Sequence, residues 1–67
     1  MAGWGDDEQL AELRSLVYEQ GWRPVRIEIV DGVDRVTVVN GDEERTLSSD
    51  HVQFHHVAEG LREEFKL

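Results

Sequence analysis

The sequence contains no cysteine among its 67 residues. This absence excludes disulfide bonds and thiolate metal sites, so packing alone must stabilise the fold. A domain of this length buries only about 60% of the surface that its unfolded chain exposes, and its core supplies roughly 3–5 kcal/mol of stability. We therefore expect one domain over residues 1–67, without room for a deep catalytic cleft.

Lysine is nearly absent, and long apolar runs are missing. Lys66 is the only lysine, and the other basic residues are arginines, as expected for a GC-rich genome. A membrane-spanning helix needs about 20 apolar residues, and no stretch approaches that length. The first seven residues also lack the basic and apolar regions of a signal peptide. We therefore expect a cytoplasmic location.

Negative charge is the abundant feature of this chain. Fifteen Asp and Glu residues against seven Lys and Arg give a formal net charge of -8. A protein that binds nucleic acid offers Lys and Arg to the phosphates, so this charge argues against direct nucleic-acid binding. A phosphate-binding loop is not indicated either, because Gly32 and Gly41 fall in predicted hairpin turns.

Hydrophobic spacing predicts a first helix over about residues 6–20. Asp6, followed by Gln9, indicates an N-cap. Gly21 predicts a left-handed end to the helix, with Trp22 packing back on the last turn. The apolar positions that recur at helical spacing are Leu10, Leu13, Leu16 and Val17.

The hydrophobic period then changes to two, which predicts three strands over about residues 24–30, 33–39 and 44–48. Asp31-Gly32 is a two-residue hairpin signal. Three cross-strand pairs follow from it: Ile27 with Val36, Val25 with Val38, and Glu28 with Arg35. A second turn around Gly41 and Asp42 pairs Val36 with Leu47 and Thr37 with Thr46, and it places Arg45 on the inner face beside Val38. The inner face that the helices should cover consists of Val25, Ile27, Ile29, Val36 and Val38.

A second helix is predicted over about residues 49–65, with Ser48 or Ser49 as its cap and Asp50 in its first turn. Gly60 lies beside the apolar stripe and indicates close approach of another backbone. The apolar face consists of Phe54, Val57, Ala58, Leu61 and Phe65. The fold class is therefore α+β, a small single domain in the order helix, three-stranded antiparallel meander, helix.

The histidines are the candidate metal ligands, because His51 and His55 are four residues apart on one side of the second helix. Zinc needs three or four protein ligands, and Glu59 is the only nearby acid. The sequence therefore favours His51, His55 and His56 as polar residues that flank the apolar stripe and titrate ordinarily at about pH 6–7, with no metal or cofactor. Ser48 and Ser49, close to His51, suit helix caps better than nucleophilic catalysis, so we expect no enzyme.

The acidic residues form three patches that could bind a partner. They are Glu8, Glu12 and Glu19 on the first helix, Asp42, Glu43 and Glu44 at the second turn, and Glu59 and Glu63 on the second helix. Glu8 with Glu12 and Glu59 with Glu63 are like-charge pairs at i,i+4. Each pair costs its helix about 0.2–0.5 kcal/mol, which favours a functional reason for these residues. Carboxylates on a rigid surface can replace phosphates.

In size and charge the chain is similar to phage and mobile-element inhibitors that mimic DNA, such as anti-CRISPR and anti-restriction proteins. This similarity implies a non-enzymatic inhibitor that occupies the basic nucleic-acid-binding surface of a protein partner. The alternative is a small structural domain of a salt-adapted prokaryote that acts as a homodimer. Val30, Val33 and Val39 are predicted to point away from the helices, which suggests a homodimer contact or a docking surface. The sequence leaves both hypotheses open.

Overall fold

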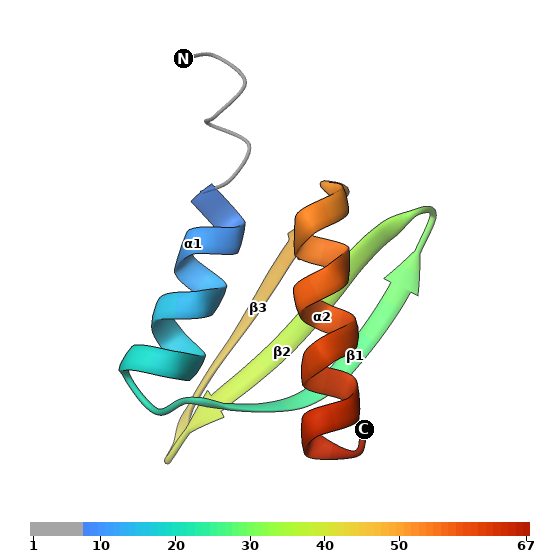
Figure 1. Cartoon of the computed structure of the whole chain (residues 1–67). Helices are drawn as coiled ribbons and strands as arrows, with labels where there is room; N and C mark the ends of the chain where they lie inside the picture. The colour runs from blue at the N-terminus through green and yellow to red at the C-terminus, as the bar shows by residue number, and fades with distance from the viewer. Residues whose placement is uncertain (1–7) are drawn as a thin grey trace.

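The computed structural model describes residues 8–67 of the chain. Its elements, in order, are α1 (Glu8–Arg14), η2 (Ser15–Glu19), β1 (Arg23–Val30), β2 (Val33–Asn40), β3 (Glu43–Ser49) and α2 (Val52–Phe65). The strands form one antiparallel sheet in the order β1-β2-β3, and the helices lie on the same face of it (Figure 1). The predicted α+β class and element order are therefore confirmed, whereas the predicted cap at Asp6 lies outside the described residues.

The first helix ends as its glycine predicts. After α1 the helix widens into the π-helical turn η2, in which the Gln20 N–H donates to the Ser15 carbonyl at 2.9 Å. Gly21 then adopts a φ of 80°, and the Trp22 N–H donates back to the Leu16 carbonyl at 2.8 Å. This reversal directs Trp22 into the core, where 8% of its surface remains exposed.

The two hairpins follow the predicted register almost throughout. Asp31 and Gly32 have φ values of 54° and 77°, as a tight turn with two left-handed residues requires. The confirmed pairs are Ile27 with Val36, Glu28 with Arg35, Val36 with Leu47, and Thr37 with Thr46. Arg45 lies opposite Val38, also as predicted.

Two residues assigned to the covered face are exposed instead. The predicted pair of Val25 with Val38 is wrong, because Pro24 pairs with Val38 and the register shifts before Arg26. Proline has no N–H for the ladder, so this edge strand accommodates it at a bulge, and Val25 is 43% exposed. Ile29 is 54% exposed. It pairs with Asp34 on the neighbouring strand, and the residue of α2 that contacts this place is the polar His55 rather than an apolar residue.

The start of α2 differs from the prediction. The N-cap is His51 rather than Ser48 or Ser49, and its Nδ1 accepts a hydrogen bond from the Gln53 N–H at 3.1 Å. Both serines belong to β3, which extends to Ser49 and so delays the helix. The predicted close approach at Gly60 is also wrong, because among the described atoms nothing would lie within 4 Å of a Cβ there.

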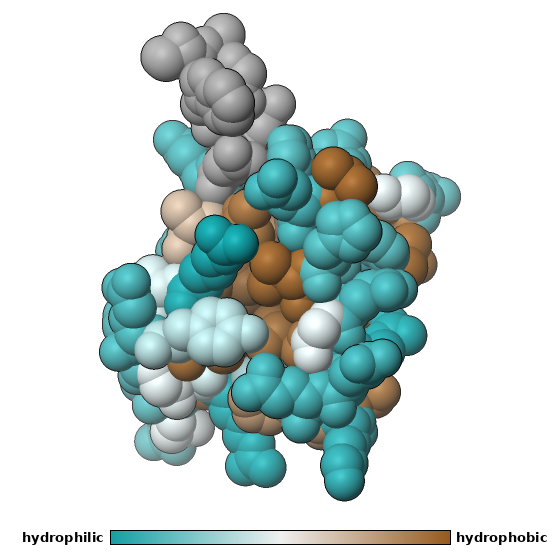
Figure 2. All heavy atoms as spheres, in the orientation of Figure 1, coloured by the Kyte–Doolittle hydropathy of each residue, from teal (hydrophilic) through white to brown (hydrophobic). Residues whose placement is uncertain are grey.

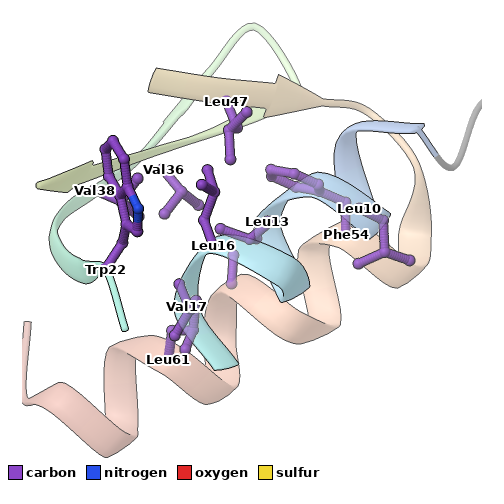
Figure 3. Packing of buried hydrophobic residues seen from close by; sticks show 11 residues of the cluster. Leu10, Leu13, Leu16, Val17, Trp22, Val36, Val38, Leu47, Phe54 and Leu61 are labelled. Atoms are coloured by element: carbon purple, nitrogen blue, oxygen red, sulfur yellow. The ribbon is translucent and has the colours of Figure 1, made fainter. Parts of the chain in front are cut away.

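The core lies between the helices and the inner face of the sheet (Figure 3). Its buried apolar side chains are Leu10, Leu13, Leu16, Val17, Trp22, Val36, Val38, Leu47, Phe54, Ala58 and Leu61. The apolar face predicted for α2 is confirmed, since its other members, Val57 and Phe65, are partly buried against this cluster. From the helix side, hydrophilic side chains cover much of the surface, and apolar atoms are visible between the helices (Figure 2). Within residues 8–67 no helix has both the length and the apolar character to cross a membrane.

Candidate functional site

Helix α1 packs over β3, and polar contacts fix its position there. Arg45 Nη2 donates a hydrogen bond to Glu12 Oε2, so the guanidinium on the inner face of the sheet has its counter-ion on the helix. The Ser48 N–H also donates to Gln9 Oε1 at 3.3 Å. The acidic face of the first helix is therefore held beside the strand that begins with Glu43 and Glu44.

A shallow hollow opens where the chain leaves η2 and meets the start of β3. It is lined by Trp22, Glu43, Glu44 and Arg45. Trp22 is almost wholly buried, whereas both glutamates are exposed. Because Arg45 is already paired with Glu12, the hollow offers two exposed carboxylates and the small exposed part of Trp22 to an incoming group. Such a combination suits a cationic side chain.

Two of the three predicted acidic patches lie on one side of the molecule. The end of η2 and the turn between β2 and β3 are at the same end of the fold (Figure 1), and the Glu12–Arg45 ion pair connects the helix to that hairpin. We call this surface the acidic edge. It consists of Glu8, Glu12, Glu19, Asp42, Glu43 and Glu44.

The remaining predicted acids are not part of this edge. Glu59 and Glu63 lie on α2, which packs on β1 and β2 rather than on β3. Glu59 has a contact of its own, because its Oε2 lies 3.4 Å from His55 Nε2. The acids of α1 and η2 and those of the β2–β3 hairpin therefore lie on neighbouring elements, whereas Glu59 and Glu63 lie together on α2.

His55 forms a hydrogen bond with a buried carboxylate that the sequence interpretation did not identify. Its Nδ1 lies 2.8 Å from Oδ2 of Asp34, which is 4% exposed. The hydrogen bond to Asp34 raises the pKa of His55 above the ordinary 6.5, and the charges of Asp34 and Glu59 act in the same direction, against burial and Arg62. The expected ordinary titration is thus wrong for His55. Strand alternation could have revealed the partner, because Asp34 shares the inner face with Val36.

The other histidines have different surroundings. His51 caps α2, and the ring of His56 lies 6.1 Å from that of His55, centroid to centroid. Across residues 8–67 no three His, Asp or Glu side chains are grouped to hold a metal ion.

The His55–Asp34 pair predicts a pH-dependent stability. Because the pKa of His55 is higher in the folded state than in the unfolded chain, the folded state binds this proton more tightly. The resulting stabilisation is complete below about pH 6.5 and is lost as the pH rises through the raised pKa. Urea unfolding of the wild type and of His55→Gln, between about pH 5 and pH 9, should show a stability difference that shrinks with rising pH. His56→Gln is the control, and a difference that grows toward alkaline pH would contradict this assignment.

Comparisons of this chain with protein-family models, with curated proteins and with solved structures find no match. A fold of this kind does not determine an activity, because one architecture supports many functions. The charges and contacts of the acidic edge are therefore the features of this chain that bear on its function.

Proposed function

We propose that this protein is a non-enzymatic interaction module whose acidic edge binds a basic surface of a protein partner. In its specific form the edge replaces DNA on a nucleic-acid-binding protein and thereby inhibits it. The observation that supports this function best is the packing of α1 over β3, which places the acids of the first helix next to the hairpin whose Glu43 and Glu44 line the hollow.

Helix α1 presents two carboxylates of the acidic edge on one rigid element. Glu8 and Glu12 are four residues apart on one helix, which separates them by about 6 Å along its axis. Glu12 is also paired with Arg45, so Glu8 carries the less compensated charge of the two. The helix supports both carboxylates, so little ordering is required when a partner binds.

The hollow provides an anchor as well as charge. An Arg or Lys side chain of the partner would lie against Trp22, with its charge near Glu43 and Glu44. Because only 8% of Trp22 is exposed, the two carboxylates supply most of the attraction for this cation. Aromatic side chains that are already held in place also lose little entropy on binding, which is why they are common at the energetic centres of interfaces.

The residues considered for catalysis have structural contacts, which supports a non-enzymatic role. His51 Nδ1 accepts the capping hydrogen bond of α2. Ser49 Oγ accepts the His51 N–H at 3.0 Å, at the junction of β3 and α2. These groups are engaged in the local geometry of the junction.

Competition with DNA tests the proposal. The protein is immobilised, exposed to a lysate of its source organism, washed, and then eluted with duplex DNA. We expect a basic protein to be released by DNA, because both ligands occupy one surface, and also by molar salt, at which the Debye length is about 3 Å. A bound protein that salt releases but DNA leaves in place would contradict the DNA-mimic form of the proposal.

A further inference from the structure

The sheet has a second face that no described residue covers. Both helices lie on the other side (Figure 1), and strand alternation directs the side chains that flank Val36 and Val38 in sequence outward. At the centre of this open face Thr37 and Thr46 are paired across β2 and β3, with their Oγ1 atoms 3.2 Å apart. Thr37 is only 8% exposed, because its neighbours on the face surround it.

The open face has the opposite charge balance to the rest of the chain. Its charged residues are Arg23, Arg26, Glu28, Arg35 and Glu44. Three positive and two negative charges give this face +1, and since the whole chain carries -8, all other residues together carry -9. Within residues 8–67, Arg26 pairs with Glu28 at 3.4 Å, whereas neither Arg23 nor Arg35 has an ion pair.

We infer that the open face binds a second copy of this chain in a symmetric dimer. The register places Arg26 beside Thr37 in one row and Glu28 beside Arg35 in the next. Consider a two-fold axis that lies in the plane of the interface, perpendicular to the strands and between these two rows. It sets Arg26 of each copy against Glu28 of the other copy. An isologous interface requires this kind of self-complementarity.

The same rotation also matches the apolar and neutral residues of the face. Val39 lies against Val33 of the second copy at both ends of the interface, and Arg35 lies against Thr37 rather than against another arginine. Val30, Val33 and Val39 thereby become the aliphatic part of the interface. Two sheets of this kind pack about 10 Å apart, with strands inclined by about 30°.

Net charge directs the association to this face. Two chains of charge -8 repel each other, and the repulsion is weakest where the arginines are concentrated. Strands of seven or eight residues give a face of about 26 Å by about 14 Å. An interface of this size is small, so we expect a weak dimer with a dissociation constant on the order of 100 µM. The dimer leaves α1 accessible. Glu44 belongs both to the open face, at one end of it, and to the acidic edge, so the dimer is tested through residues outside the acidic edge.

Charge exchange tests the dimer. Sedimentation velocity of the wild type, from about 10 to about 500 µM, should show a concentration-dependent dimer. Arg26→Glu sets acids of the two copies against each other at the centre. Glu28→Arg sets arginines against each other there, beside the Arg35 side chains. Each variant should weaken dimerisation about 100-fold, because opposed like charges are costly. The double variant Arg26→Glu, Glu28→Arg should restore it.

Arg14→Glu is the matched control, because this exposed residue of α1 gives the same change of charge on the helix side and should leave dimerisation nearly unchanged. A wild type that is monomeric throughout the range would overturn the inference. So would single variants that dimerise as the wild type does, or a double variant that stays dissociated while circular dichroism shows it folded.

Discussion

Phe54→Ala should destabilise the protein by about 3–5 kcal/mol. The Phe54 side chain is fully buried in the cluster that α1, α2 and the sheet share (Figure 3). Its removal takes away the transfer free energy of the ring and leaves a cavity that rigid neighbours fill only in part. A domain of this size has only about 3–5 kcal/mol in total, so we expect the variant to be largely unfolded at room temperature.

Urea denaturation followed by circular dichroism measures this loss. Val52→Ala is the control on the same helix, because Val52 is 60% exposed and its truncation should change the free energy of unfolding by no more than about 0.5 kcal/mol. A Phe54→Ala variant that keeps a cooperative transition within about 1 kcal/mol of the wild type would contradict the core described here.

Features of the fold that depend on neighbouring residues could be predicted from the sequence. Asp31 and Gly32 accept the left-handed conformations that the first hairpin needs, so the register that follows them was largely predictable. Gly21 likewise determines where the first helix stops. In both cases the signal and its structural effect lie within a few residues of each other.

Features that depend on distant residues could not be predicted in this way. The bulge at Val25 arises because proline meets a strand ladder, and alternation alone continues through it. The cap of α2 moved to His51 because pairing with β2 extends β3 to Ser49. Strand periodicity does not report where such pairing ends.

The candidate site was predicted residue by residue, but its grouping was not. Each glutamate of the acidic edge was identified from the sequence, whereas the contact between Glu12 and Arg45 joins residues 33 positions apart. Its prediction requires knowing that α1 lies over β3 rather than over β1. The contact of His55 with Asp34 was not predicted for the same reason, because this contact depends on where α2 crosses the sheet.

Reversing the charges at the hairpin should abolish partner binding. In the variant Asp42→Lys, Glu43→Lys, Glu44→Lys, each substitution changes the charge by +2, so the net charge rises from -8 to -2. The hollow beside Trp22 then presents lysines to a basic partner. We expect affinity to fall by at least about 100-fold, because opposed like charges cost several kcal/mol.

A control variant separates position from total charge. Glu59→Lys, Glu63→Lys, Glu64→Lys also brings the net charge from -8 to -2. Its substitutions all lie at exposed positions of α2, which packs on β1 and β2 rather than on β3. Long-range attraction is screened beyond about 8 Å at physiological salt, so this variant should lose no more than about 3-fold in affinity.

The most direct test of the acidic edge is the dissociation constant of the DNA-released partner, measured for the wild type and for both triple variants at about 0.15 M salt. The proposed function predicts that the hairpin variant fails to bind while the α2 variant binds nearly as the wild type does, with both variants folded by circular dichroism. Equal losses in the two variants would contradict it, and would show that the acidic residues act only through the total charge of the protein.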